Sequence, residues 1–280
     1  MVNNGGLSTR PLLASDRLVT HRPRGSIVLH GGNLSVESKI RAIARSLNIP
    51  LEELQASDMM SDAHLQALRE ECQKQKIFDI YEELRQRCCF EGKTVVCVTI
   101  ASSTAAQDAE YYKLLFRLLG AAKVLTIANE QDASAPGIID DIKYGDNPLG
   151  WFGGGDQKRF GDAHFIGSPA HQAMYERYLN RSDYTVGGTS AGAGAMSRKV
   201  PWKSEIIQGL GFLQDIVVDM HVRRGVFNDP PLKHKSRVPR LQSAVEVATK
   251  NDGDKSKLGL GFDENTWAFI RGGNLEAGGR

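Results

Sequence analysis

The sequence has no long apolar run. No stretch of its 280 residues approaches the roughly 18 consecutive apolar residues that a membrane-spanning helix needs. Residues 1–25 lack the apolar segment of a secretory signal peptide and carry three arginines toward their end. We therefore expect residues 1–24 to form a flexible tail, and residues 25–280 to form a single domain with no membrane association.

Cysteine is also scarce, and its spacing suits neither a metal site nor a disulfide framework. The four cysteines are Cys72, Cys88, Cys89 and Cys97, with no C-x-x-C pair among them and no histidine at zinc-finger spacing. Reduced thiols in a cytoplasmic protein are the simplest interpretation. We expect no metal and no other cofactor.

A concentration of basic residues is absent as well. Lys and Arg number 35 against 33 Asp and Glu, and they are scattered along the chain. Proteins that bind nucleic acid or membrane surfaces usually carry a basic face, so neither partner is expected. The 41% of hydrophobic residues is enough for one large domain with a substantial core.

Alternating strand and helix patterns predict an α/β fold. Residues 25–30 form a short apolar run before a Gly-Gly turn, and residues 94–100 are a β-branched run typical of a strand covered on both faces. Between these two strands, residues 36–47 have apolar residues at helical spacing, and Ser35 is the expected N-cap. Further strands are predicted at 123–128, 150–152, 184–189, 216–222, 245–248 and 267–270, and further helices at 111–119, 171–179 and 191–196. The alternation predicts a three-layer sandwich with a mostly parallel sheet.

One short turn carries the strongest chemical signal. Residues 188–192 read G-T-S-A-G, between a predicted strand and a predicted helix. A nucleophile exposed at the end of a strand needs a turn so tight that the residues two before and two after it have no room for side chains. The amides at the start of the next helix would face the developing negative charge. Ser190 is therefore the candidate nucleophile of a serine hydrolase.

Two alternative interpretations of this turn are weaker. Gly192 and Gly194 open a helix as in a dinucleotide-binding loop, but Ser197 replaces the third glycine and no ribose-binding acid follows the next strand. A phosphate-binding P-loop is excluded because the sequence contains no G-K-[S/T]. A chance match to G-x-S-x-G is the remaining alternative.

A serine nucleophile needs a base, and the base needs an orienting acid. His221 is the best candidate base because it ends an apolar strand, where a parallel sheet presents its site. His30 ends the first strand and could line the same site. Glu264 is the preferred acid, and Asp263 and Asp219 remain alternatives. The order serine, histidine, acid differs from that of an ordinary α/β-hydrolase, so a different fold is expected.

A second glycine loop, G-G-G-D-Q at residues 153–157, also follows an apolar strand. Glycines there would let a backbone amide approach the substrate closely. Gly155 and Ala191 are therefore the candidate oxyanion donors. A plain turn, in which Asp156 and Gln157 cap the next helix, is the alternative.

Together these residues resemble the cyanophycinase-like serine peptidases and the related aspartyl dipeptidases. The match keeps the motif order over most of the chain from residue 25 onward. Its motifs are F-G-G-G-D-Q (152–157), G-G-T-S-A-G-A (187–193), D-M-H-V-R-R-G (219–225), G-L-G-F-D-E-N-T (259–266) and the opening G-S-I-V-L-H-G-G. The resemblance implies a fold related to class I glutamine amidotransferases, a metal-free mechanism and a homodimer.

The resemblance also implies a role for each matching residue. Ser190 would be the nucleophile, His221 the base and Glu264 the acid, while Gly155 and Ala191 would supply the oxyanion donors. The candidate substrate-binding residues are Asp156, Gln157, Asp219 and Arg224. Arg224 would bind a substrate carboxylate, and a surface salt bridge is its alternative role.

This sequence departs from the family around the histidine and before the second predicted strand. Met220 and Val222 stand where cyanophycinases have Gln and Phe, and Val226 and Asp229 stand at two of three arginine positions. Those arginines hold the polymer in the family, so the match to cyanophycin itself is weakened. A helix-prone stretch at about 48–90, expected to form two helices, looks like an insertion without a catalytic role.

The expected function is a serine exopeptidase that hydrolyses aspartyl or β-aspartyl peptides, including β-Asp-Arg substrates like those in cyanophycin. Its partner would be a small peptide or peptide polymer. A non-catalytic protein that binds a peptide or metabolite on the same fold is one alternative, and an esterase is another.

Overall fold

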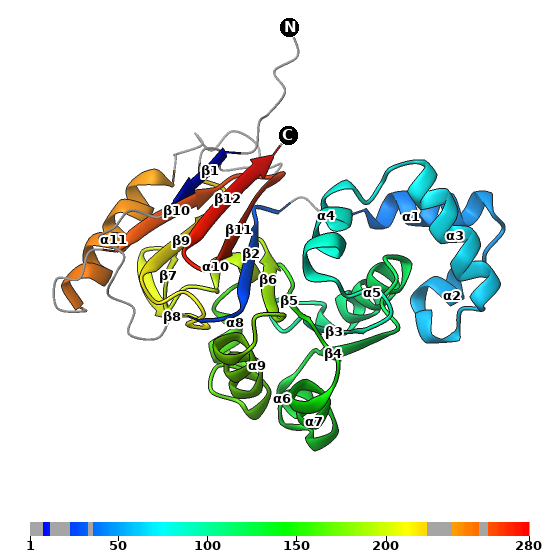
Figure 1. The fold of residues 1–280 in the computed structure, drawn as a ribbon, viewed down its shortest axis with the longest axis horizontal. Coiled ribbons are helices and arrows are strands. Elements are labelled where there is room, and N and C mark those ends of the chain that lie inside the picture. Colours follow the sequence, from blue (N-terminus) through cyan, green and yellow to red (C-terminus); the bar gives the residue numbers. More distant parts are fainter. Residues whose placement is uncertain (1–7, 12–22, 33–35, 223–236, 252–256, 280) are drawn as a thin grey trace, which may run out of the picture.

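A computed structural model describes residues 8–11, 23–32, 36–222, 237–251 and 257–279. Its largest feature is a sheet with the strand order β1-β12-β11-β2-β6-β5-β3-β4 (Figure 1). The strands of this sheet are β1 (Ser8–Pro11), β2 (Ser26–His30), β3 (Thr94–Val98), β4 (Lys123–Ile127), β5 (Leu149–Phe152), β6 (Thr185–Thr189), β11 (Thr266–Arg271) and β12 (Asn274–Gly279). The five strands from β2 to β4 run parallel to one another, and β11, β12 and β1 extend the sheet antiparallel.

Helices cover both faces of this sheet, as the sequence pattern predicted (Figure 1). They are α1 (Glu37–Ser46), α2 (Leu51–Gln55), α3 (Asp62–Lys74), α4 (Asp79–Cys88), α5 (Ala105–Leu118), α6 (Glu130–Ser134), α7 (Pro136–Tyr144), α8 (Arg159–Asp162), α9 (Pro169–Asn180), α10 (Ala191–Gly194) and α11 (Val238–Asn251), with a 3₁₀ turn at Ser57–Met59. The chain thus has a mixed α/β fold with a mostly parallel central sheet.

Strand β3 shows why both faces are covered. Val95 and Cys97 pack into the core beneath α1, α3, α4 and α5, while Val96 and Val98 pack into the core that includes α9 and α10. All four side chains are fully buried. Since successive side chains of a strand point to opposite faces, a continuous apolar run is what a two-sided sheet requires.

Two smaller sheets lie beside the main one. Strand β9 (Ile216–Met220) pairs in parallel with β10 (Leu258–Phe262), and β7 (Lys199–Trp202) forms an antiparallel hairpin with β8 (Glu205–Gln208). Helix α11 packs its buried face, which includes Leu241, against Val217 of β9. These elements carry the base and the acid described below.

The prediction of a strand at residues 245–248 was wrong. These residues lie inside α11, because Leu241, Ala244 and Ala248 recur at helical spacing and form its buried face. Valine favours strands, and Val245 and Val247 alternate in this stretch, but tertiary packing outweighs that preference. Strand β10, which the sequence pattern had not indicated, occupies the following stretch.

Three other regions differ in detail from expectation. Within the predicted tail, Ser8–Pro11 forms edge strand β1 against β12, a pairing made by backbone hydrogen bonds that needs no apolar pattern. The stretch at 48–90 holds α2, α3 and α4 instead of two helices. The predicted N-cap Ser35 lies outside the described residues, and α1 begins at Glu37.

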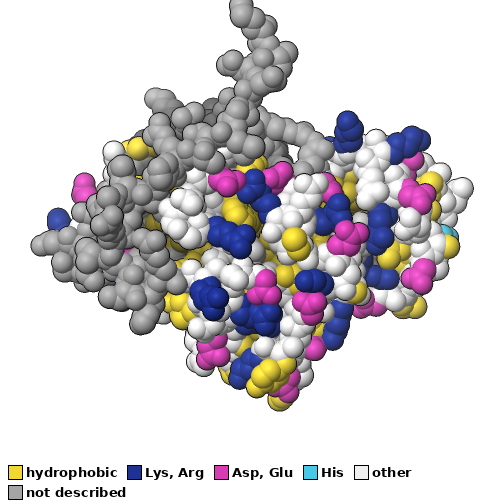
Figure 2. All heavy atoms as spheres, in the orientation of Figure 1, with side chains coloured by type: hydrophobic (Ala, Val, Ile, Leu, Met, Phe, Trp, Pro, Cys, Tyr) yellow, Lys and Arg dark blue, Asp and Glu magenta, His cyan; other side chains and the backbone are white. Residues whose placement is uncertain are grey.

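Basic and acidic side chains are interspersed on the face seen in Figure 2, so this face carries no large patch of a single charge. In the described parts of the chain, no helix combines the length and apolarity needed to cross a membrane. The cysteines of those parts, Cys72, Cys88, Cys89 and Cys97, are all free thiols.

Candidate active site

Ser190 occupies a strained turn between β6 and α10. Its φ is 51° and its ψ is −118°, a backbone conformation that costs a non-glycine residue about 1–3 kcal/mol. The Ser190 amide donates to the carbonyl of His30 over 2.9 Å, which fixes the turn to the neighbouring strand β2. Such strain persists only where the surrounding structure holds it, and it is common at catalytic residues.

Close packing explains the two glycines that flank the serine. A methyl carbon placed on Gly188 would lie 2.6 Å from the carbonyl carbon of Gly192, and one placed on Gly192 would lie 2.2 Å from the carbonyl oxygen of Phe152. Neither contact is possible for a real side chain. The requirement for small residues two before and two after Ser190 is therefore a property of the folded turn.

Ser190, His221 and Glu264 form one hydrogen-bonded line. Ser190 Oγ lies 3.2 Å from His221 Nε2, and His221 Nδ1 lies 2.7 Å from Glu264 Oε1. With Nδ1–H donating to the carboxylate, the Nε2 lone pair faces the serine hydroxyl. The side chains of His221 and Glu264 are 11% and 16% exposed, so the line is shielded but accessible.

Strand pairing brings the base and the acid together. In the parallel pair of β9 and β10, Met220 is the register partner of Phe262. His221 follows the first strand by one residue and Glu264 follows the second by two, so both lie at the same end of this pair. A parallel sheet presents its site at the carboxyl ends of its strands.

Asp219, the candidate acid on β9, forms an ion pair with Arg240. Asp219 is 2% exposed, and its carboxylate binds the guanidinium of Arg240 through two hydrogen bonds, one of them 2.8 Å long from Nε to Oδ2. Its Oδ1 also accepts the Met220 amide over 2.8 Å. Of the three acids considered from the sequence, Glu264 is the one hydrogen-bonded to His221 Nδ1.

Three backbone amides are candidate oxyanion donors, one in the serine turn and two in the glycine loop. Within the described residues, the amides of Gly154, Gly155 and Ala191 donate to no acceptor of the protein. A methyl carbon on Gly154 would lie 3.5 Å from Ser190 Cβ, so this loop runs beside the nucleophile. The sequence had singled out Gly155 and Ala191, and Gly154 joins them as a candidate.

Asp156 and Gln157 hold the glycine loop to the β7–β8 hairpin. Asp156 Oδ1 accepts from Trp202 Nε1 over 2.7 Å and from the Lys158 amide over 3.0 Å, while Gln157 Nε2 donates to the Pro201 carbonyl over 3.2 Å. These contacts give both side chains a structural task. The prediction that they bind substrate stays untested, and Arg224 lies outside the described residues.

Arg237 is a neighbour of the base that sequence reasoning missed. Its Nη1 donates over 3.0 Å to the carbonyl of Met220, the residue before His221, and burial lowers the pKa of its guanidinium. In the described part of the chain no carboxylate forms an ion pair with it. No motif marks Arg237, because it reaches the site from the start of α11.

His30, whose carbonyl accepts the Ser190 amide, is 1% exposed. Burial lowers its pKa from 6.5 to about 4, because a charged imidazole would lose its hydration there. The unfolded chain would bind a proton at this histidine near pH 6.5, whereas the native chain binds it only near pH 4. The native state therefore binds fewer protons between these values, and its stability falls as the pH drops through that window.

The buried His30 should make the free energy of unfolding depend on pH below neutrality. Between pH 7 and pH 5, we expect the His30 effect to lower the free energy of unfolding by about 2 kcal/mol. Urea unfolding of the wild type and of His30→Asn at both pH values measures it, since other acid-sensitive groups are common to the two proteins. An equal pH dependence in both would show that His30 titrates normally in the native state.

The chain is a mixed α/β protein with a serine, a histidine and a carboxylate aligned beside its parallel sheet. No protein-family model matches the sequence, and no curated protein matches it.

Two solved structures similar to this chain carry peptidase names. A peptidase from an acI-B1 Actinobacterium is 20% identical, with a TM-score of 0.53 over 91% of this chain and 88% of that one. A candidate peptidase E from Listeria monocytogenes is 14% identical, with a TM-score of 0.46 over 91% of this chain and 98% of that one. The first likeness shows that the two chains share a fold.

Proposed function

We propose that this protein is a serine-type peptidase that acts through Ser190, His221 and Glu264. The observation that carries the proposal is the unbroken line of 3.2 Å and 2.7 Å contacts through the two histidine nitrogens, beginning at a strained turn. The solved peptidase with the same fold supports the hydrolase class. A strained serine without such a line would not be activated.

The proposed reaction is an acyl transfer in two stages. His221 Nε2 takes the Ser190 hydroxyl proton as the oxygen attacks the scissile carbonyl, and free amides of Gly154, Gly155 and Ala191 stabilise the oxyanion. His221 then returns the proton to the leaving amine. Departure of the amine leaves the acyl group bound to Ser190 Oγ as an acyl-enzyme. Water, deprotonated by His221, then attacks the acyl carbonyl, and His221 passes that proton to Ser190 Oγ as the acid leaves. Glu264 keeps the proton on Nδ1 throughout and stabilises the imidazolium.

We propose aspartyl or β-aspartyl peptides as substrates, so the site must bind a carboxylate. Arg237 supports this choice, because its partly buried guanidinium lies beside the base and forms no ion pair among the described residues. A guanidinium fork matches a carboxylate in geometry and charge. It would do for the substrate what the resemblance assigns to Arg224.

A dipeptide panel tests this function. We expect hydrolysis of peptides with normal or β-linked Asp to exceed that of matched Asn peptides by about 10²-fold in kcat/KM, because a desolvated Arg–carboxylate contact is worth a few kcal/mol. Arg237→Gln should reduce this preference mainly by raising KM. Esters without a carboxylate serve as the control. Hydrolysis of the esters alone would indicate an esterase. If neither peptides nor esters were hydrolysed, the protein would be a binding protein.

A further inference from the structure

His30 is tied to the nucleophile by its backbone and to the following turn by its side chain. Its carbonyl accepts the Ser190 amide over 2.9 Å, and its Nδ1 accepts the Gly32 amide over 3.0 Å. The hydroxyl of Thr189 lies 3.3 Å from the same nitrogen. One buried residue thus contacts both the end of β6 and the turn after β2.

The turn that His30 holds is also bonded to the loop that carries Glu264. The Gly31 amide donates to the Thr266 carbonyl over 2.9 Å, and the Asn265 amide donates to the Gly32 carbonyl over 3.3 Å. A methyl carbon on Gly31 would lie 1.6 Å from the Asp263 carbonyl oxygen, so the two segments are in direct contact. The position of the acid depends on this turn.

The same turn packs against the two other members of the line. A methyl carbon on Gly32 would lie 3.1 Å from His221 Cε1 and 3.5 Å from Ser190 Cβ. Displacement of Gly32 would therefore press on the base, or leave a gap beside it. His30, through Gly32, is connected to the serine, the histidine and the acid.

We propose that His30 is a positioning residue that sets the alignment of Ser190, His221 and Glu264 by accepting the Gly32 amide at Nδ1. The proposal rests on the function proposed above, since it states how that catalytic line is held. His30 does not itself reach the reacting atoms by any described contact. It acts through the Gly31–Gly32 turn.

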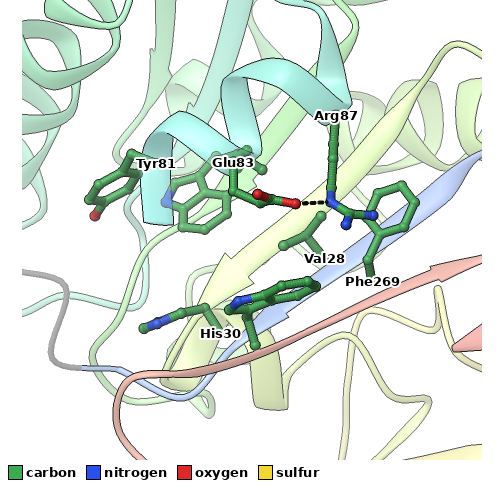
Figure 3. Close-up of a pocket in the computed structure, with 9 residues that line it drawn as sticks. Val28, His30, Tyr81, Glu83, Arg87 and Phe269 are labelled. Atoms are coloured by element: carbon green, nitrogen blue, oxygen red, sulfur yellow. Dashed lines mark hydrogen bonds and ion pairs between the residues drawn. The ribbon is translucent and has the colours of Figure 1, made fainter. Parts of the chain in front are cut away.

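This task requires the neutral imidazole with its proton on Nε2. An amide donor at Nδ1 needs a lone pair there, and protonation would set one N–H against another. Burial, which lowers the pKa to about 4, keeps the ring neutral near pH 7. His30 also lines a cavity of about 20 Å³ between β2 and α4, opposite Glu83 and Arg87 (Figure 3). A space of this size accommodates about one water molecule.

Two variants of His30 with similar shape distinguish the loss of a hydrogen-bond acceptor for the Gly32 amide from a change in side-chain volume. Leucine and asparagine have the same branched outline, but only asparagine offers an oxygen where His30 presents Nδ1. We expect His30→Leu to lower kcat by about 10²-fold with KM within about threefold, because misalignment affects the reaction more than binding. His30→Asn should stay within about fivefold of wild type. Equal loss in both variants, or none in His30→Leu, would overturn the proposal.

A readout that needs no turnover keeps this test separate from the proposed function. In proteins with isotope-labelled histidine, the His221 Nδ1 proton bonded to Glu264 gives a downfield resonance. It should be retained in His30→Asn and shifted or lost in His30→Leu, with both variants shown to be folded by circular dichroism. If Ser190→Ala keeps full activity, the proposed function fails, yet this resonance still decides whether His30 aligns the base and the acid. A resonance unchanged in His30→Leu would refute the positioning role.

Discussion

Ser190→Ala should lower kcat/KM for a cleaved peptide by about 10⁴–10⁶-fold, the range found when a hydrolase loses its serine nucleophile. The physical reason is that His221 Nε2 would lie next to a methyl group and no acyl-enzyme could form. Substrate binding should change little, because the oxyanion amides and Arg237 remain. Steady-state kinetics on purified protein measure both effects.

The matched control is Ser38→Ala, which removes a hydroxyl from an exposed position on α1. It should keep wild-type activity. Alanine at residue 190 relieves none of the backbone strain, so both variants should also unfold close to the wild-type midpoint. If Ser190→Ala retained more than about a tenth of wild-type activity, the nucleophile would have to be another group.

Glu264→Gln should lower kcat by about 10²–10⁴-fold with a small change in KM. A glutamine can donate its amide N–H to His221 Nδ1, which shifts the imidazole proton to Nε2. That tautomer has no lone pair to receive the serine proton. The loss should therefore be large although the substitution hardly alters the shape of the side chain.

Asp263→Asn is the control for this acid, because it makes the same chemical change one residue earlier in the same turn. Its activity should stay within about threefold of wild type. A large loss in Asp263→Asn together with a small loss in Glu264→Gln would assign the orienting role to Asp263. The Asp219 carboxylate is less suited to the comparison, since its substitution would leave the half-buried Arg240 guanidinium without its carboxylate partner.

The parts of the fold that local pattern determines were predictable from the sequence. The β-branched strand at residues 94–98 and the turn around Ser190 both follow from short-range rules of packing and sterics. The roles of Ser190, His221 and Glu264 remain predictions, although their side chains do meet in the structure. The register of β9 with β10 brings His221 and Glu264 together, and the sequence pattern had not indicated β10.

The remaining parts depend on contacts between distant segments. The valine-rich stretch at residues 245–248 became helical because packing of α11 on β9 decides its conformation. Arg237 approaches the base from α11, and His30 acts through an amide two residues away, so neither has a recognisable spacing. Asp219 was predicted to bind substrate, and its ion pair with Arg240 depends on a residue 21 positions later.

The most direct measurement of the central claim is covalent labelling with a fluorophosphonate, followed by peptide mass mapping. A serine activated by the His221–Glu264 pair should take up one phosphonyl group at Ser190, and Ser190→Ala should take up none. Glu264→Gln should label far more slowly than the wild type. Equal labelling of wild type and Ser190→Ala, or an adduct on a different residue, would contradict the account.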